Sequence, residues 1–563
     1  MSNREVIYYD VSPFAALSAS GRATNITDFS DVSKLFKENQ VFRSIQTCEK
    51  NYTVLDGTHC GFVNDERKEP ENIALWNTAQ NSLPSRELPF IVTLDVSFGG
   101  LQSSSGIAFY FDRENNVYCD CLNVKWYRGS TLVSDRDFNP DSAIYSCIND
   151  VEFYDRVQVT FRRLNMPYRY FRLEAVIFGI VRFFADDSLE SLTINEGADP
   201  TGRSIYISTA EFTINMKEPV PYLFLKRQPV YIRYNAESIG VYYVDKSRKH
   251  ADMRYSIQAV DKVGVLDNTE EFIGGMYNNV PAEDIIHSIV GGLFDVIIDE
   301  GLKDVPVTGW IPICKKRIAL AQVALAIGAI IDASRTGEIK VRQMPQHLSG
   351  SIGRDRVYTT SSVDIAFPYT GIELIEHNYI IGSPADTKDL FKDTFTGEKI
   401  IKFSKPHSNY QITNGTIINI GVNFARISST GAAECILRGR AYIDNQNSVI
   451  ITAGDMIEGT EEKIEKIENG YLVNSGISWV VAKRLYNYYQ RQNVFNGDIL
   501  LNTRTGGIGG TETRIDEMEK IGDIVTVATG FKDTMGDITG QIEKLALNLG
   551  YKNIKARGII RGN

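Results

Sequence analysis

Histidine is scarce in this chain, and its spacing excludes the common metal motifs. Only six histidines occur among 563 residues, and no two lie within four positions of each other. A zinc site of the HExxH type needs two histidines one helical turn apart, so none is expected. There is also no GxSxG elbow, and the glycine-rich segment 506–510 lacks the Lys-Ser/Thr pair of a phosphate loop. We therefore predict no enzyme, no catalytic residue, no metal ligand and no cofactor.

Cysteine is sparse and irregularly spaced. The seven cysteines are odd in number and contain no CxxC pair, which argues against the disulfide framework of a secreted protein. Cys119 and Cys121 would point the same way on a strand, but no further pair lies nearby to complete a zinc site. Reduced, buried cysteines are the simpler expectation.

Long apolar runs and basic stretches are missing as well. The most apolar segment, 318–331, is too short to span a bilayer and contains Gln322. The first residues lack the basic segment and apolar core of a signal peptide, so we expect synthesis in the cytoplasm and no membrane insertion. The net charge is -10, and no basic stripe of the kind that neutralises nucleic-acid phosphates is present.

Aromatic residues and strand-forming patterns, in contrast, are abundant. The chain has 28 Tyr and 27 Phe but only 17 Pro, which favours strands. At about 150 residues per domain, its length suggests three or four domains. Six strand-like runs between 90 and 179 have no intervening helix and predict an antiparallel sandwich that closes near residue 190. Before them we expect a short helix at 30–39 and a hairpin at 53–63.

After residue 270 the spacing of apolar residues changes from the alternation of strands to the spacing of helices. Apolar residues at helical spacing predict helices at 281–299 and 317–337, followed by a strand at 338–344. These elements indicate a small α/β lobe. The elements expected after the lobe are strands through 350–460, a helix at 476–494 and alternating runs near the C-terminus.

The stretch 238–267 combines ten charged or histidine side chains with alternating apolar residues, so it has two interpretations. Apolar residues alternate at 240–244 and again at 254–261, as in two paired strands. Between them, the charged segment 245–252 fits a solvated hairpin tip, which is the structure we predict. A metal site would instead need inward-facing Asp245, His250 and Asp252.

One local cluster of acids also has a catalytic and a structural interpretation. Glu373 and Glu376 lie three residues apart beside His377. Two carboxylates can support glycoside cleavage, but such pairs are defined by their distance in space rather than in sequence. A solvated turn end is the expectation for this cluster.

The order of elements from about 200 to 563 carries a family resemblance. The hairpin 238–267 and the helix "AEDIIHSIV" are followed by "GWIPICKKRIALAQVALAIGAIIDASRTGEIKV", by "EKIEKIENGYLVNSGISWVVAKRLYNYYQRQ" and by "GDIVTVATGFKDTMGDITGQIEKLALNL". This series resembles the central hub proteins of phage tails and of related contractile injection machines.

The N-terminal part, about 40–180, resembles the discoidin or galactose-binding-like sandwich of some prophage tail proteins. The residues that carry this resemblance are "YTVLDG" (52–57), Trp76, "SSSGIAFYFD" (103–112), "KWY" (125–127) and "MPYRYFRLEAVIFG" (166–179). This resemblance implies the sandwich fold more strongly than it implies sugar binding, because a fold does not define a function. Trp126 is expected in the core.

The resemblance implies a structural role in a virion. Hub proteins of this kind carry two tail-tube-like modules per protomer, so a homotrimer ring imitates a six-fold ring and joins the six-fold tube to the three-fold tip. The net negative charge is compatible with a lumen that passes DNA. The implied location is the tail baseplate or tip, after assembly in the bacterial cytoplasm. The implied partners are further copies of the chain, tail-tube or distal tail subunits, a spike or tip protein, baseplate wedge proteins and a tape-measure protein.

Two alternative functions remain open from the sequence. Residues 1–190 could make the chain a receptor- or carbohydrate-binding tail protein, with a host cell-wall glycan as partner. A tail-associated cell-wall hydrolase is the other alternative, although the chain ends at "ARGIIRGN" without a Cys/His or Glu-rich module.

The predicted fold class is mainly β with α+β lobes: a discoidin-like β-sandwich followed by tail-tube-like β-barrel modules with a small inserted α/β lobe. The predicted domains are a sandwich at 1–190, a first hub β-barrel segment at 191–270, the α/β lobe at 271–349, a β-rich hub domain at 350–470, and a helix with a C-terminal β-barrel segment at 471–563.

Overall fold

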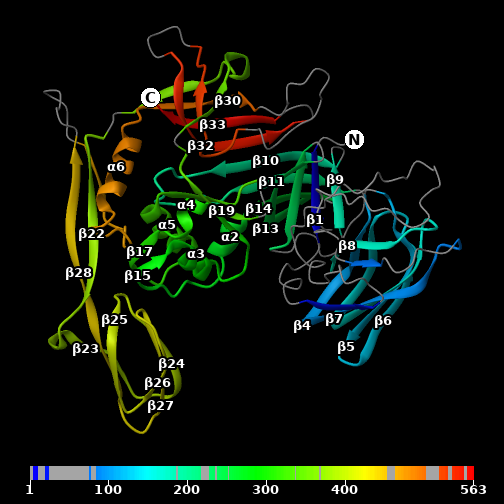
Figure 1. Cartoon of the computed structure of the whole chain (residues 1–563), viewed down its shortest axis with the longest axis horizontal. Helices are drawn as coiled ribbons and strands as arrows, with labels where there is room; N and C mark the ends of the chain where they lie inside the picture. Colours follow the sequence, from blue (N-terminus) through cyan, green and yellow to red (C-terminus); the bar gives the residue numbers. More distant parts are fainter. Residues whose placement is uncertain are drawn as a thin grey trace.

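A computed structural model of the chain shows a mainly β protein with few helices (Figure 1), which confirms the predicted mainly β class. The residues that the structure describes are 4–9, 19–24, 75–77, 84–113, 115–179, 181–185, 188–216, 227–234, 237–251, 253–335, 338–345, 347–366, 369–452, 463–501, 519–530, 536–550 and 554–562. The expected helix at 30–39 and hairpin at 53–63 lie outside these residues.

The N-terminal unit is a seven-stranded sheet in the order β3-β8-β4-β7-β5-β6, with β2 paired to β4. Its strands are β2 (Ser20–Thr24), β3 (Leu75–Asn77), β4 (Glu87–Phe111), β5 (Cys119–Arg128), β6 (Thr131–Phe138), β7 (Ile144–Leu164) and β8 (Phe171–Ile177). The alternation predicted for β4 is confirmed, because Val92, Leu94 and Val96 are buried while Ile91 is exposed. Trp126 is also buried, as expected. The described strands form one sheet, and the second layer of a discoidin-like sandwich stays a prediction.

The middle of the molecule is a 13-stranded sheet. Its main path has the order β21-β30-β33-β32-β10-β11-β14-β13-β12-β1-β9. Beside this path, β31 pairs with β32, and β20 pairs with β31. Its strands are β1 (Arg4–Tyr9), β9 (Val181–Ala185), β10 (Leu189–Gly197), β11 (Thr209–Asn215), β12 (Pro229–Tyr234), β13 (Glu237–Ala251), β14 (Arg254–Val260), β20 (Leu348–Ile352), β21 (Ser362–Ile365), β30 (Asn493–Leu500), β31 (Ile524–Val527), β32 (Ile538–Leu549) and β33 (Ile554–Gly562).

Two sequence-distant halves meet in this sheet where β10 pairs antiparallel with β32, a contact that we call the seam. Ile194 faces Leu547 in the seam register, and both side chains are fully buried. One hydrophobic core runs beneath both halves, from Val6 near the N-terminus to Ile560 near the C-terminus. The halves are therefore packed as one unit although the facing residues Ile194 and Leu547 are 353 positions apart in sequence.

The α/β lobe, residues 262–343, packs beside the large sheet (Figure 1). Its helices are α2 (Lys262–Asp267), α3 (Ala282–Val290), α4 (Glu300–Lys303) and α5 (Lys316–Ile327). Its strands are β15 (Gly275–Pro281), β16 (Val296–Ile298), β17 (Pro306–Ile311), β18 (Ala329–Asp332) and β19 (Ile339–Gln343). None of the helices that the structure describes is long and apolar enough to cross a membrane.

Both helices predicted in the lobe exist, but the predicted C-terminal ends were wrong. The chain leaves α3 at Gly291 and α5 at Gly328, which have φ of 70° and 76°. Glycine adopts this left-handed conformation at little cost and commonly ends helices there. The apolar residues that follow, which extended the helical pattern in the sequence, continue instead as the short strands β16 and β18.

A long β hairpin, which we call the arm, spans 371–452 and ends in a small distal sheet. Its strands are β22 (Gly371–Ile381), β23 (Thr387–Asp393), β24 (Thr396–Lys402), β25 (His407–Thr413), β26 (Thr416–Ile420), β27 (Phe424–Thr430) and β28 (Cys435–Thr452). β29 (Ile464–Ile467) adds to β22, and α6 (Ser478–Tyr489) packs against β22 and β28. The described residues also form two 3-10 turns, η2 (Arg354–Arg356) and η3 (Pro384–Asp386). Figure 1 shows the arm and the N-terminal sheet at opposite ends of the molecule.

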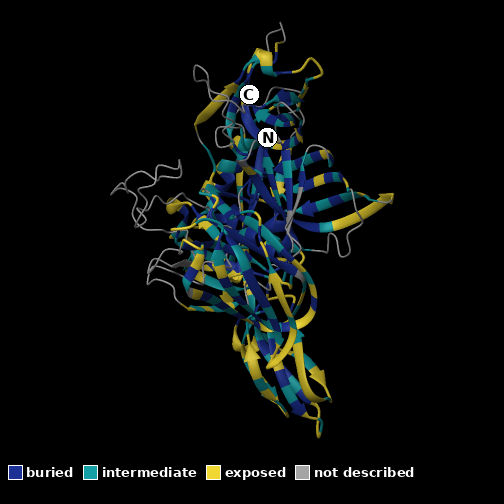
Figure 2. Cartoon of the chain, turned by 90° about the vertical axis from the view of Figure 1, so that its right-hand side faces the viewer, coloured by how far each residue is buried: buried dark blue, intermediate teal, exposed yellow. Residues whose placement is uncertain are grey.

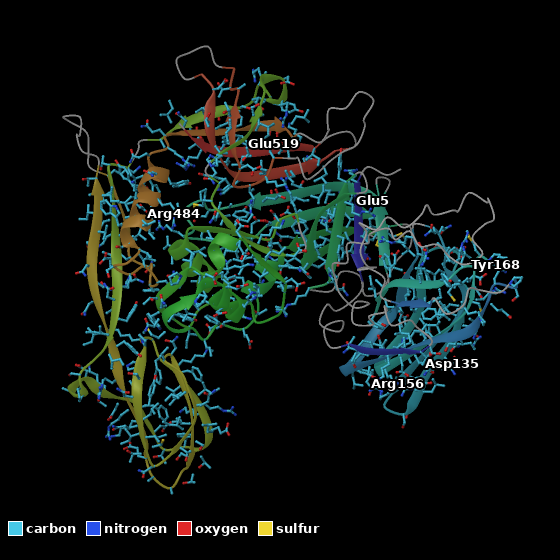
Figure 3. The ribbon with its side chains drawn as sticks, in the orientation of Figure 1. Glu5, Asp135, Arg156, Tyr168, Arg484 and Glu519 are labelled. Atoms are coloured by element: carbon cyan, nitrogen blue, oxygen red, sulfur yellow. The ribbon has the colours of Figure 1, made fainter. Side chains whose placement is uncertain are left out.

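The root of the arm is attached to the lobe through α6. Arg484 of α6 donates a hydrogen bond to the carbonyl of Leu325 near the end of α5 (Figure 3). Burial lowers the pKa of Arg484 to about 10. Leu325 also packs with Val481 and Leu485 of α6, so apolar and polar contacts join the same two helices.

The charged hairpin 238–267 differs from its prediction at the tip. β13 continues as a strand through Ala251 and pairs with β14 almost to the turn, so the expected loop tip was wrong. The charges of this segment are nevertheless exposed. The described strand β12 pairs with β13 only as far as Tyr243, and the side chains of residues 246–251 beyond that point are exposed.

Asp261, an acid of that stretch, has a local structural role. It is buried at the N-terminus of α2, where its carboxylate accepts hydrogen bonds from the backbone N–H groups of Gly264 (2.9 Å) and Ser208 (2.8 Å). Burial, opposed by these hydrogen bonds, raises its pKa from 3.8 to about 7.

This shifted pKa predicts a specific pH dependence of stability. The folded protein keeps the proton of Asp261 up to about pH 7, whereas the unfolded chain releases it near 3.8. The stability that the group contributes therefore falls as the pH rises between these values, by on the order of 4 kcal/mol. Asp261→Asn stays neutral, so its melting temperature relative to wild type should rise across this window in calorimetry. Asp364→Asn, an exposed control on β21, should show no such trend, and a pH-independent difference for Asp261→Asn would contradict the prediction.

Candidate functional site

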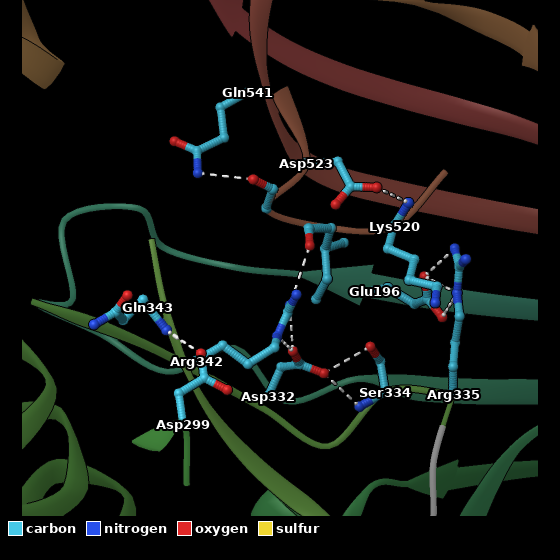
Figure 4. Close-up of polar contacts among 12 residues, drawn as sticks. Glu196, Asp299, Asp332, Ser334, Arg335, Arg342, Gln343, Lys520, Asp523 and Gln541 are labelled. Atoms are coloured by element: carbon cyan, nitrogen blue, oxygen red, sulfur yellow. Dashed lines mark hydrogen bonds and ion pairs between the residues drawn. The ribbon is translucent and has the colours of Figure 1, made fainter. Parts of the chain in front are cut away.

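The polar contacts beside the seam tie three parts of the chain together (Figure 4). Glu196 is the penultimate residue of β10, and Arg335 follows β18 of the lobe. Arg335 donates from Nε and Nη2 to the Glu196 carboxylate at 2.7–3.0 Å, and from Nη1 to the carbonyl of Glu519 at 2.8 Å. The side chains of Glu196 and Arg335 are 0% and 5% exposed, so this is a fully desolvated ion pair.

A second pair reinforces the same joint. Asp332, at the end of β18, accepts hydrogen bonds from the backbone and hydroxyl of Ser334 and from Arg342 at 2.6 Å. Arg342 also donates to the carbonyl of Ile521, which lies in the C-terminal half (Figure 4). We call Glu196, Asp332, Arg335 and Arg342 the junction cluster. It holds the lobe against both halves of the large sheet at their seam.

The solvent face of the large sheet carries a continuous polar row across the seam. Successive strands from β13 to β33 place Lys246, Gln258, Glu211, Thr193, Asn548 and Lys555 side by side. None of the six is buried, whereas their sequence neighbours Phe212, Ile194 and Leu547 face the core. The two halves therefore present one shared polar surface.

The arm exposes more apolar surface than its small core requires. Its own core cluster has five buried residues, Phe403, Ala425, Ile427, Cys435 and Leu437. Seven isoleucines of the arm are exposed: Ile380, Ile381, Ile400, Ile418, Ile420, Ile443 and Ile450. Ile380 and Ile443 face each other across β22 and β28, and Figure 2 shows the exposed residues along the arm. These isoleucines lie on β22, β24, β26 and β28, and exposed apolar groups that form a patch are typical of interaction surfaces.

A cavity of about 580 Å³ lies between α6, the large sheet and the segments that lead into β22 and β29, and we call it the arm-root pocket. Its walls come from the loop after β10, the segments before β22 and β29, the C-terminal end of α6 and the end of β33. Its prominent side chains are Arg203, Lys463, Arg491 and Arg561 with Tyr369 and Tyr489. The size is within the usual range of small-ligand sites.

The acid cluster at 373–377 makes contacts that hold the arm. It lies in the middle of β22, so the expected solvated turn end was wrong. Glu373 and Glu376 are three residues apart on a strand and therefore point to opposite faces. Glu376 accepts a hydrogen bond from Ser478 of α6. The buried His377 ring lies 2.7 Å from the Asp444 carboxylate through Nδ1 and 2.8 Å from the Glu468 carbonyl through Nε2. These contacts fix the root of the arm.

The charged hairpin brings no metal ligands together among the described residues, a range that does not include Asp252. His250 Nε2 lies 2.8 Å from the Ser256 hydroxyl, across the β13–β14 pair. Asp261 lies away from the tip, at the N-cap of α2.

The cysteines that the structure describes are free thiols, and three of the five are buried. Burial raises the pKa of Cys119 to about 12 and also raises that of Cys147. Thiols of this kind are unreactive because the thiolate is the nucleophile. Cys48, Cys60 and the glycine-rich segment 506–510 lie outside the described residues.

Comparison with known proteins gives distant structural likenesses. No protein-family model matches the sequence, and no curated protein matches it. Among solved structures, the chain is similar to a tail protein from Neisseria meningitidis MC58, with a TM-score of 0.43 and 8% identity over 68% of this chain and 94% of that chain. It is also similar to the prophage MuSo2 43 kDa tail protein from Shewanella oneidensis, with a TM-score of 0.41 and 11% identity over 67% of this chain and 94% of the other.

A third similar structure is prophage tail protein gp18 from Listeria monocytogenes EGD-e, with a TM-score of 0.38 and 10% identity over 68% of this chain and 91% of that one. At these TM-scores the likenesses carry no functional argument for this chain.

Proposed function

We propose that the chain is a structural component of a phage tail or tail-like particle, and that it serves as a trimeric hub between the six-fold tube and the three-fold tip. The observation that carries the proposal is the 13-stranded sheet, in which two sequence-distant halves pair at one seam and share one core and one polar face. Three such chains would present six halves, and closed rings of this kind follow from repeated identical contacts.

Surface features support assembly rather than catalysis. The exposed isoleucines of the arm need a covering partner in a stable assembly. Among the described strands β21 lies at one end of the sheet and exposes Ile365, and apolar sheet edges are usually covered. In this proposal, tail-tube or distal tail subunits, a spike protein, wedge proteins and a tape-measure protein are the neighbours, and the location is the virion.

The oligomeric state tests the hub proposal. Light scattering of the full chain should give a species of three times the 63.1 kDa protomer mass. Ile380→Lys with Ile443→Lys should shift this species toward the monomer, because two charges would replace a facing apolar pair. The melting temperature should change little, since both side chains are exposed.

The matched control is Lys399→Gln, a change of charge at an exposed, paired position on the same arm. It should leave the mass unchanged. A wild-type chain that stays monomeric at all concentrations and is absent from purified particles would overturn the proposal, and a lysis band on cell-wall zymograms would favour the hydrolase alternative.

A further inference from the structure

The end of the arm, residues 387–441, touches the lobe in addition to the attachment at its root, and we call these residues the arm tip. Figure 1 shows the arm tip beneath the lobe strands β15 and β17. Asn423, in the turn between β26 and β27, is 1% exposed. Trp310 Nε1 donates to Asn423 Oδ1 at 2.7 Å, and Asn423 Nδ2 donates to the carbonyls of Ile273 and Ile311, each at 2.9 Å. These bonds use the amide oxygen and both amide protons.

The lobe provides a fitted site for this amide. Gly274 has a φ of 66°, and a Cβ atom there would lie 2.6 Å from Asn423 Nδ2. Only glycine therefore leaves room for the side chain of Asn423 in this position. On the opposite side, the ring of Trp310 packs against Tyr379 and Tyr471, with centroids 5.9 Å and 5.5 Å away. These rings fix the indole that donates to Asn423.

The contact between arm tip and lobe is polar, whereas the arm root is joined to the lobe by an apolar core. Lys402 of the arm tip pairs with Glu271 at 2.7 Å, but both side chains are more than half exposed, and such pairs add little stability. Among the described residues, the core of the arm tip and the core of the lobe share no member. At the root, in contrast, Leu325 of α5 belongs to one core with α6 and β22. Opening the contact at Asn423 therefore divides no hydrophobic core.

The arm tip and the arm root are connected through one continuous strand. Residues 442–452 of β28 pair with β22, and residues 435–441 of the same strand pair with β23 and β25. β22 ends at Ile381, where the pairing partners of β28 change. A few residues at the end of an element commonly absorb the rotation between two packed bodies. This point of β28 is a hinge in position.

We propose that Asn423 is a releasable latch, which holds the arm tip in a docked position and lets it swing about the hinge in β28 without unfolding. In the released position, water replaces the hydrogen-bond partners of Asn423, and Trp310 keeps its aromatic neighbours. Exchange of hydrogen bonds with water has a small net cost, so a narrow polar contact can open while both cores stay intact. The latch does not depend on the hub proposal.

Fluorine NMR of the full chain, labelled with 5-fluorotryptophan, tests the latch through Trp310. The chain has four tryptophans, and Trp310→Phe assigns the signal. In wild type, this signal should exchange with a minor signal of the released position. Asn423→Asp should shift the equilibrium toward release by about a hundredfold or more, because its carboxylate has no proton to donate to the Ile273 and Ile311 carbonyls. Asn419→Asp, the same change at an exposed position of β26, is the matched control and should leave all four signals unchanged.

Small-angle X-ray scattering at matched protein concentration shows whether the arm tip moves. The radius of gyration should be larger for Asn423→Asp than for wild type, while the signal of Trp126 in the N-terminal sheet stays in place. Asn423→Ala, which brings no charge, should act in the same direction more weakly. A Trp126 signal that moves together with the Trp310 signal would mean general unfolding. An unchanged radius of gyration, or a wild-type Trp310 signal without exchange, would mean a fixed joint, and each of these three results would overturn the latch.

Discussion

Replacing Arg335 by methionine is expected to lower the free energy of unfolding by about 3 to 5 kcal/mol. The variant keeps most of the side-chain volume but leaves the Glu196 carboxylate charged and 0% exposed, without its bidentate partner. The same change removes the hydrogen bond to the Glu519 carbonyl. The lobe would thereby lose its main polar attachment to the seam.

Urea unfolding measures this loss, and a double-mutant cycle isolates the pair. Arg335→Met combined with Glu196→Gln should cost less than the sum of the two single changes, because the double variant leaves no uncompensated charge. Arg557→Ala, on the exposed face of β33, is the control and should cost less than about 0.5 kcal/mol. Additive costs for Glu196 and Arg335 would mean that the pair is not coupled.

The sequence predicted local structure well where one periodicity dominates. The β4 alternation, the starts of α3 and α5, and the core position of Trp126 could all be predicted because neighbouring residues determine them. The ends of α3 and α5 were missed because Gly291 and Gly328 end each helix in the left-handed conformation, while apolar residues continue beyond them. The extended β13 was missed because an exposed strand segment tolerates the same charged side chains as a solvated loop.

The junction cluster and the arm-root pocket lie beyond such local patterns. Arg335 is 139 residues from Glu196, and the pocket wall is drawn from residues between 199 and 561. Only the tertiary fold brings these side chains together, and a single sequence contains no signal for their pairing. The acid cluster at 373–377 shows the converse, because proximity in sequence suggested a site where strand alternation separates Glu373 from Glu376.

A substitution in the seam has the second large expected effect on the free energy of unfolding. Leu547→Asp places a charge where Ile194 and Leu547 meet in the buried core, so it should lower the free energy of unfolding by more than about 4 kcal/mol. Asn548→Asp introduces the same side chain one residue later, on the exposed face of β32, and should change stability by less than about 0.5 kcal/mol. The two variants differ in which side of one strand receives the charge.

Hydrogen exchange and light scattering together distinguish a local defect from a separated sheet. In Leu547→Asp, faster exchange should appear in both β10 and β32, because each strand supplies the other's hydrogen-bond partners at the seam. If the hub proposal is correct, the trimer mass should also be lost, since a separated half cannot hold its place in a ring. Faster exchange in β32 alone, with β10 still protected, would show that the N-terminal half keeps its fold without the seam. In that case the shared sheet would no longer explain the assembly.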